Sequence, residues 1–140
     1  MNMDALSIAL SGLTAQQQRL GATASNIANV ATTGSVPSSD PLAPASTVYK
    51  PLEVSFTALT TGNGDPAGVK AQVSERADGY TVFFDPDNIH ANAEGLVAAP
   101  NVSLENEIVN LLLTKTLFKA NAAVIKTQNE MSGALLDQLT

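Results

Sequence analysis

The chain has 140 residues, which gives room for one small domain with extensions. Its hydrophobic content of 44% is that of a folded protein, whereas charged residues make up only 14%, against about 25% in a typical soluble domain. The net charge of −6 argues against a nucleic-acid-binding protein, which needs a basic surface to neutralise phosphates, and the absence of cysteine excludes disulfides, thiolate metal ligands and cysteine catalysis.

Residues 4–31 form the first predicted helix, which would be about 40 Å long. Its apolar side chains recur at a spacing of four and three residues, close to a coiled-coil heptad and interrupted only at Gln17. This stripe consists of Leu6, Leu10, Leu13, Leu20, Ala24, Ile27 and Ala31. The other side is small and uncharged, a surface that lets another backbone approach closely. It consists of Ser7, Ser11, Thr14, Ala15, Gln18, Ala22 and Ser25.

A linker is predicted after this helix. Residues 29–34 lose helix formers and end on Gly34, which suits a C-cap or a turn. Residues 35–47 contain Pro37, Pro41 and Pro44 among serines and alanines, so they bury little and cannot continue a helix. The sequence therefore predicts an N-terminal axial helix over residues 1–34 and an extended linker over residues 35–47, whose order would depend on a partner.

Residues 48–102 are predicted to form a small β domain with loops. From residue 48 to 84 the apolar side chains recur with a period of two, in three runs around Val54, Ala71 and Val82. Asp78 and Gly79 lie between the last two runs and are predicted to form a hairpin turn. Residues 60–68 are predicted to be a surface loop, and residues 97–102 to lead into the next helix. The simplest interpretation is one antiparallel sheet.

The second predicted helix occupies residues 103–139, with Ser103 as its N-cap and with Glu105 and Glu107 at the positive end of its dipole. It is apolar on two opposite sides. One face comprises Leu104, Ile108, Leu111, Phe118, Ala122, Ile125 and Leu136. The opposite face comprises Val109, Leu113, Leu117, Ala120, Val124, Met131 and Leu135. One flank between them is charged, and the other is polar and mostly uncharged, with Asn110, Thr114, Asn121, Gln128 and Ser132.

Two opposed apolar faces imply that this helix is buried between two neighbours. One neighbour would be the first helix, and the other a different subunit. The alternative is a two-helix core inside a monomer. Both interpretations give an α+β fold, with two long terminal helices forming an axial, coiled-coil-like pair around a small antiparallel β domain, and with residues 103–140 as the C-terminal axial helix.

The sequence offers little chemistry, so no enzyme, metal site, cofactor or small-molecule substrate is predicted. The one histidine, His90, lies near Asp85 and Asp87 in a turn-rich segment, where a surface or hydrogen-bonding role is the more common one. The alternative is an enzyme whose site is built around Asp85, Asp87 and His90. Gly62 and Gly64 lack the spacing of a dinucleotide-binding loop.

No basic segment followed by an uninterrupted apolar run opens the sequence, and no stretch approaches about 18 consecutive apolar residues. A cleaved signal peptide and a membrane span are therefore not expected. An extracytoplasmic location would need another export route.

Motifs at both ends resemble the flagellar basal-body rod, hook and hook-associated proteins. At the N-terminus the motif includes Ser11, Gly12 and Leu13, then Ser25, Asn26, Ile27, Ala28 and Asn29. The C-terminal motif ends on residues 117–121, with Ala120 and Asn121. Within the family the resemblance is strongest to the short, proximal-rod members, through residues 49–54, 84–86 and 94–102. Phe118 stands where this family commonly has tyrosine.

The resemblance implies a structural subunit of the periplasmic rod, which transmits motor torque and is exported by the flagellar type III apparatus without signal cleavage. Its implied partners are copies of itself, other rod proteins, the membrane-anchored basal-body base and the export apparatus, with no nucleic acid. The alternatives are another short rod protein of the same family, or a helical adaptor of the export apparatus.

Under this hypothesis each apolar face has a role. The intramolecular pair would be held by Leu6, Leu10, Leu13, Leu20 and Ile27 against Leu104, Ile108, Leu111, Phe118 and Ile125. Contacts between subunits would be made by Val109, Leu113, Leu117, Val124, Met131 and Leu135. Asn26 and Asn29 would either be buried hydrogen-bonding residues that fix the helix register, or simply end the helix.

Overall fold

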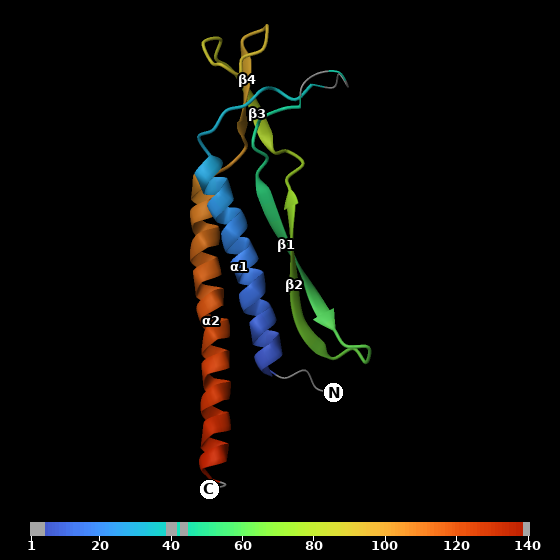
Figure 1. Cartoon of the computed structure of the whole chain (residues 1–140), viewed down its shortest axis with the longest axis vertical. Coiled ribbons are helices and arrows are strands. Elements are labelled where there is room, and N and C mark those ends of the chain that lie inside the picture. The colour runs from blue at the N-terminus through green and yellow to red at the C-terminus, as the bar shows by residue number, and fades with distance from the viewer. Residues whose placement is uncertain (1–4, 39–41, 43–44, 139–140) are drawn as a thin grey trace. The chain divides into compact units, whose positions relative to one another are not determined.

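The computed structural model describes residues 5–38, 42 and 45–138. The element order is α1 (Ala5–Asn29), β1 (Leu52–Thr60), β2 (Pro66–Glu75), β3 (Tyr80–Phe84), β4 (Leu96–Pro100) and α2 (Leu104–Asp137) (Figure 1). The predicted α+β class, with two long terminal helices around an antiparallel β region, is confirmed. The predicted helix ends at Asp4 and Leu139, and the linker residues 39–41 and 43–44, lie outside the described residues.

Local polar contacts define where α2 begins. The Ser103 hydroxyl accepts a hydrogen bond from the backbone N–H of Asn106 over 3.3 Å, as an N-cap does. Two hydrogen bonds lower the pKa of the Glu105 carboxyl below its usual value. The larger effect comes from the backbone N–H of Glu105 itself, and the smaller from the Ser103 hydroxyl. The predicted start of the second helix is therefore one residue before α2.

The strands form two separate two-stranded sheets, β1 with β2 and β3 with β4. A short loop joins β1 to β2, in which Thr61 donates to the carbonyl of Asp65 over 2.8 Å, so these strands run antiparallel. In the second sheet Tyr80 lies opposite Pro100, and Phe84 opposite Leu96. The antiparallel prediction is correct, but the single sheet is not.

The predicted hairpin turn at Asp78 and Gly79 is wrong, because β2 and β3 belong to different sheets. The backbone groups here bond elsewhere: the Gly79 carbonyl accepts from the N–H of Asn101 over 3.1 Å. Strand β4, predicted only as a lead into the helix, lacks polar alternation. Val97 and Ala98 are completely buried, and a strand covered on both faces shows no such alternation.

The chain divides into two compact units. The first contains Met1–Gly21, Val54–Val73 and Asn110–Thr140, and the second contains Ala22–Glu53 and Ser74–Val109. Each unit therefore takes a part of both helices and a part of the β region. The predicted division into helix, linker, β domain and helix follows the order of elements along the chain. These two units instead group segments that are distant in the sequence and pack against each other.

In the second unit Gly34 makes a close backbone contact rather than merely ending a helix. Its N–H and carbonyl pair with those of Ala98 over 2.9 and 3.0 Å. A Cβ atom added at Gly34 would collide with the backbone nitrogen of Val48, a buried residue. The ends of the predicted linker also approach here, since the Ser35 N–H donates to the Thr47 hydroxyl over 3.0 Å.

We expect Gly34→Ala to destabilise the protein by about 2 kcal/mol or more, because the added methyl group forces this backbone pair apart. Urea denaturation of the purified chain, followed by circular dichroism, measures the change. Gly62→Ala is the matched control, since a Cβ atom there meets no atom of the described residues within 4 Å. Equal stability of the two variants would show that the Gly34 contact tolerates a side chain.

Candidate functional site

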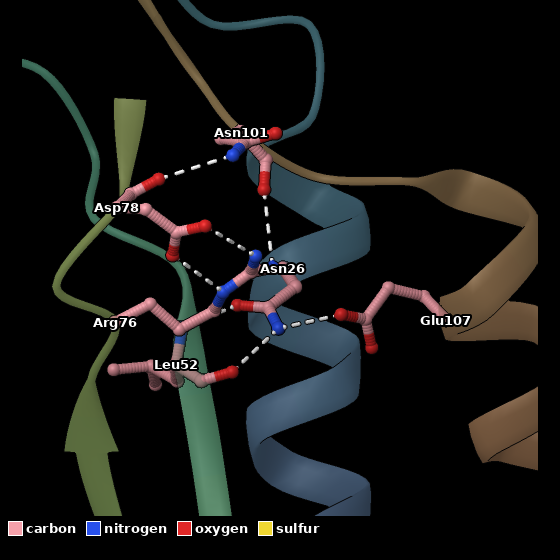
Figure 2. A network of polar contacts seen from close by, with 6 residues as sticks. All are labelled: Asn26, Leu52, Arg76, Asp78, Asn101 and Glu107. Carbon is pink, nitrogen blue, oxygen red and sulfur yellow. Dashed lines mark hydrogen bonds and ion pairs between the residues drawn. The ribbon is translucent and has the colours of Figure 1, made fainter. Parts of the chain in front are cut away.

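Asn26 is the centre of a buried polar network in the second unit (Figure 2). The residue is 2% exposed. Its Oδ1 atom accepts a hydrogen bond from the Leu52 N–H over 2.8 Å, and its Nδ2 atom donates to the Leu52 carbonyl over 2.8 Å. The side-chain amide thus pairs with both backbone groups at the start of β1, as a neighbouring strand would.

The same amide reaches two further segments. Asn26 Nδ2 donates to Glu107 Oε1 of α2 over 2.8 Å, and the Tyr49 hydroxyl donates to Asn26 Oδ1 over 3.0 Å. Glu107 is also buried, at 7% exposure. A carboxylate removed from water needs hydrogen-bond donors, and Asn26 supplies one. Asn26 therefore joins α1, the segment before β1 and the first turns of α2.

A second group of contacts fixes the chain between β2 and β3, close to this network (Figure 2). The Arg76 guanidinium forms an ion pair with Asp78 at 3.4 Å and donates to the Asn101 carbonyl over 3.2 Å. The Asn101 amide in turn donates to the Asp78 carbonyl over 3.1 Å. These bonds replace the predicted hairpin and hold the segment that precedes α2.

Asn29 differs from Asn26. Its amide donates to the Ser25 carbonyl in its own helix over 2.9 Å, and its carbonyl accepts from the Thr32 N–H over 3.0 Å. Of the two roles weighed from the sequence, the structure places Asn26 in a buried hydrogen-bonding position and Asn29 at the helix end. Within residues 26–29 of the terminal motif, Asn26 therefore bonds to other segments of the chain, and Asn29 ends the helix.

In the first unit the contact between the helices is made by small and polar side chains. The Arg19 guanidinium donates to the Asn110 side chain over 2.9 Å. A Cβ atom at Gly12 would come within 2.7 Å of the Asn121 side chain, so the two helices approach closely at this glycine. Thr114 lies on the same stripe of α2 and is 3% exposed. The stripe identified from the sequence as a polar flank therefore faces α1.

The leucines predicted for this contact are more exposed than those polar residues. In the first unit Leu6, Leu10, Leu20, Leu111 and Phe118 are 36–57% exposed, while Leu13 and Ile125 are half-buried. In the second unit Leu104 and Ile108 are also exposed, and Ile27 is half-buried. In the first unit the closest approach of the two helices is therefore on a neighbouring stripe, because small side chains permit closer backbones than two rows of leucine do. Leu20, Leu111 and Phe118 nevertheless line one groove together.

On the small-residue side of α1, Ser11 contacts the chain's own β2. The Ser11 hydroxyl donates to the Ile8 carbonyl over 2.6 Å and accepts a hydrogen bond from the Val69 N–H over 3.0 Å. A Cβ atom at Gly68, where φ is +115°, would collide with the Ser11 hydroxyl. The close backbone approach expected from the sequence is present, but its partner is β2.

The residues predicted to contact other subunits are all exposed. They form one apolar face of α2, which we call the outer face: Val109, Leu113, Leu117, Val124, Met131 and Leu135. Their exposures range from 36% to 63%. An apolar face of this length on a single chain marks an interaction surface.

In the first unit a groove with a volume of about 530 Å³ lies between side chains of α1 and α2. Its lining consists of Gln16, Leu20, Leu111, Thr114, Lys115, Phe118 and Lys119. Gln16 is 8% exposed, and its Oε1 atom accepts no hydrogen bond from the described part of the chain. The nearby Thr114 hydroxyl does not donate to Gln16 Oε1, since it donates to the Asn110 carbonyl of its own helix over 2.7 Å.

The region around His90 has its own hydrogen bonds. The Asn88 amide donates to Asp85 Oδ2 over 3.1 Å, and Asn88 Oδ1 accepts from the His90 N–H over 3.0 Å. Among residues 5–38, 42 and 45–138, no three histidine or acidic side chains are grouped so that they could hold a metal ion.

One 18-residue window of α2 has a mean hydropathy of 1.4, enough by length and composition alone for a membrane span. The sequence prediction concerned uninterrupted apolar runs, and α2 contains none of about 18 residues; this window instead meets a criterion of mean hydropathy. An isolated window of this kind is weak evidence, because helices that pack against other protein surfaces meet the same criterion.

Comparisons with known proteins identify relatives of both terminal regions. Residues 6–34 match the family described as "Flagella basal body rod protein", and residues 93–138 match "Flagellar basal body rod FlgEFG protein C-terminal". The chain is 36% identical over 126 residues to flagellar basal-body rod protein FlgC of Escherichia coli O6:H1, covering 89% of this chain and 87% of the relative.

Two other bacteria have similar proteins. Flagellar basal-body rod protein FlgC of Agrobacterium fabrum is 32% identical to this chain over 143 residues, and the alignment covers 98% of this chain and 97% of the relative. Flagellar basal-body rod protein FlgC of Bacillus subtilis is 30% identical to this chain over 143 residues, and the alignment covers 96% of this chain and 93% of the relative. The similarity therefore extends through the β region as well as the terminal helices.

Proposed function

Because this chain belongs to the FlgC family of flagellar basal-body rod proteins, it is a structural subunit of the rod, and we propose that it builds the proximal rod through its terminal helices. The observation that supports this proposal most directly is the exposed outer face of α2, including Leu113 and Val124. A rod subunit would cover such a face with its neighbours.

The partners in this proposal are copies of this chain, other rod proteins and the membrane-anchored base. The low charge of the chain supports it, since 14% charged residues leave much surface suited to burial. The helices would transmit motor torque along the rod in the periplasm. Export would use the flagellar type III apparatus without a cleaved signal peptide.

Asn26 has a separate part in this proposal. It would hold α1, the start of β1 and the start of α2 in one register, through its contacts with Leu52 and Glu107. A subunit that transmits torque needs its helix ends fixed to the rest of the chain, and a buried, fully bonded amide provides this fixation.

Deletion of the gene tests the proposed role. We expect non-motile cells whose purified basal bodies, seen by electron microscopy, keep the membrane-anchored base and lack the rod. Re-expression of the intact chain should restore both rods and swimming. Complete rods in swimming cells of the deletion strain would contradict the proposal and favour an adaptor of the export apparatus.

A further inference from the structure

We infer that two copies of this chain, when free of the rod, pair edge to edge through β3, antiparallel and with Val82 of one copy opposite Val82 of the other. This association uses a different surface from the outer face of α2, and it does not rest on the proposed role in the rod. Two features of β3 point to it: the direction of its backbone groups and the absence of charge along the strand.

The hydrogen bonds of β4 determine which backbone groups of β3 point away from it. Gly34 and Ala98 exchange both of their backbone hydrogen bonds, so Ala98 directs its N–H and carbonyl away from β3. Val82 lies opposite Ala98. Hydrogen-bonded and non-hydrogen-bonded pairs alternate along an antiparallel ladder, so Val82 directs its own backbone groups to the open edge of β3, the side away from β4. Tyr80 and Phe84 do the same.

Two bonds beyond the ends of β3 agree with this alternation. The Asp85 N–H donates to the Gly95 carbonyl over 2.9 Å, and the Asn101 N–H donates to the Gly79 carbonyl over 3.1 Å. The odd-numbered positions therefore bond toward β4, and the even-numbered ones face outward. Within the described part of the chain, only β4 pairs with β3, and the outward groups of Val82 have no hydrogen-bond partner.

An open edge with this pattern complements itself. In an antiparallel pair centred on Val82, Tyr80 of each copy lies opposite Phe84 of the other, and each opposed pair exchanges two hydrogen bonds. Tyr80 and Phe84 are 37% and 69% exposed in the single chain. The pairing would place these aromatic rings side by side on adjacent strands, where such cross-strand pairs are stabilising.

Strand β3 also lacks the features that keep edge strands apart. Natural edge strands commonly carry lysine, proline or a bulge, which prevent pairing with another chain. Residues 80–84 contain no charged residue and no proline, and all five side chains are exposed. A second copy therefore meets no like charge at any position of the pair, and it presents the same outward N–H and carbonyl groups in the opposite direction.

The symmetry of this pair places it outside the rod. The same surface is used on both copies, so the pair closes as a dimer and leaves no further β3 edge. Growth of a rod instead needs two different surfaces to meet in each contact. The β3 pair therefore belongs to the chain before assembly, where it would cover an edge that otherwise promotes aggregation.

Disulfide cross-linking of the purified chain tests the register, because the chain has no cysteine of its own. A chain with Thr81→Cys is mixed with a tagged chain that carries Phe83→Cys, and the mixture is oxidised. In the proposed pair these positions lie opposite each other as a non-hydrogen-bonded pair, with Cα atoms about 4.5 Å apart, which a disulfide can span. Two chains of the same kind place their cysteines about 8 Å apart, which is too far. We expect mixed dimers at least about tenfold above the dimers of either variant alone.

A charge at the centre of the pair tests the same contact. Val82→Lys in both cysteine chains would place two lysines opposite each other, so the yield of mixed dimers should fall by about fivefold or more. Val82→Lys in one chain and Val82→Glu in the other should restore the yield. Val73→Lys is the matched control, because Val73 is a similarly exposed valine of β2, at 41% against 45% for Val82.

Several results would overturn the inference. Equal yields from Thr81→Cys alone and from the mixture would show a different register. No mixed dimers, or an unchanged yield with Val82→Lys, would show that the β3 edge stays open. If the cysteine variants do not fold, sedimentation equilibrium of the unsubstituted and Val82→Lys chains decides: the dimer dissociation constant should rise about fivefold or more, and an equal constant overturns the pairing. The gene-deletion experiment is unaffected by these results, so failure of the rod proposal is distinguishable.

Discussion

Replacing Leu113 or Val124 with aspartate is expected to abolish rod assembly while the chain itself stays folded. Both side chains are exposed in the single chain, at 44% and 46%, so a carboxylate there remains in water. In the rod, the same carboxylate would be buried against a neighbour without a partner, which costs several kcal/mol at each contact. Because 1.4 kcal/mol is a factor of ten, incorporation should fall by more than about a hundredfold.

Two measurements separate assembly from folding. Basal bodies from a deletion strain that expresses each variant are examined by electron microscopy, alongside swimming assays. Thermal unfolding of the purified variants should match that of the unsubstituted chain within about 0.5 kcal/mol, as for other exposed substitutions.

The matched control is Asn129→Asp, an exposed polar position on the side of α2 opposite Leu113. Rods should form normally with this variant. Normal rods with Leu113→Asp or Val124→Asp would show that these residues stay exposed in the assembly, and would remove the outer face as an interface.

Asn26→Ala is expected to destabilise the second unit by about 3–5 kcal/mol. The substitution leaves the N–H and carbonyl of Leu52 and the buried Glu107 carboxylate without their partner, and each unsatisfied buried group costs about 1–3 kcal/mol. Urea denaturation followed by tyrosine fluorescence suits this measurement, because Tyr49 donates to the same amide.

Two further variants make the Asn26 test specific. Asn26→Asp keeps the size of the side chain but replaces its donor with an oxygen that faces Glu107, so it should destabilise at least as much as alanine does. Asn29→Ala should cost less than about 1 kcal/mol, because among the described residues its amide bonds to the Ser25 carbonyl of its own helix. A stability loss for Asn29→Ala equal to that for Asn26→Ala would contradict the difference between the two residues.

The sequence alone was sufficient for the two long helices and for the period of the strands. These features depend on local patterns: the 3.6-residue recurrence of apolar side chains, the cap at Ser103 and the alternation around Val54 and Val82. The terminal motifs were sufficient for the family resemblance that the relatives confirm. The exposed outer face was also predicted from periodicity, although the identity of the neighbour that covers it is a proposal.

Only the tertiary structure decided which stripes meet. Helical periodicity identifies the apolar stripes, but it does not show that Gly12 and Asn121 bring the backbones together and leave Leu10 and Leu20 exposed. Likewise, Asp78 and Gly79 have the composition of a hairpin turn, yet bonds from Arg76 and Asn101 hold them in a connection between sheets. The partners of Asn26 lie 26 and 81 positions away along the chain, and no local pattern records pairings of that length.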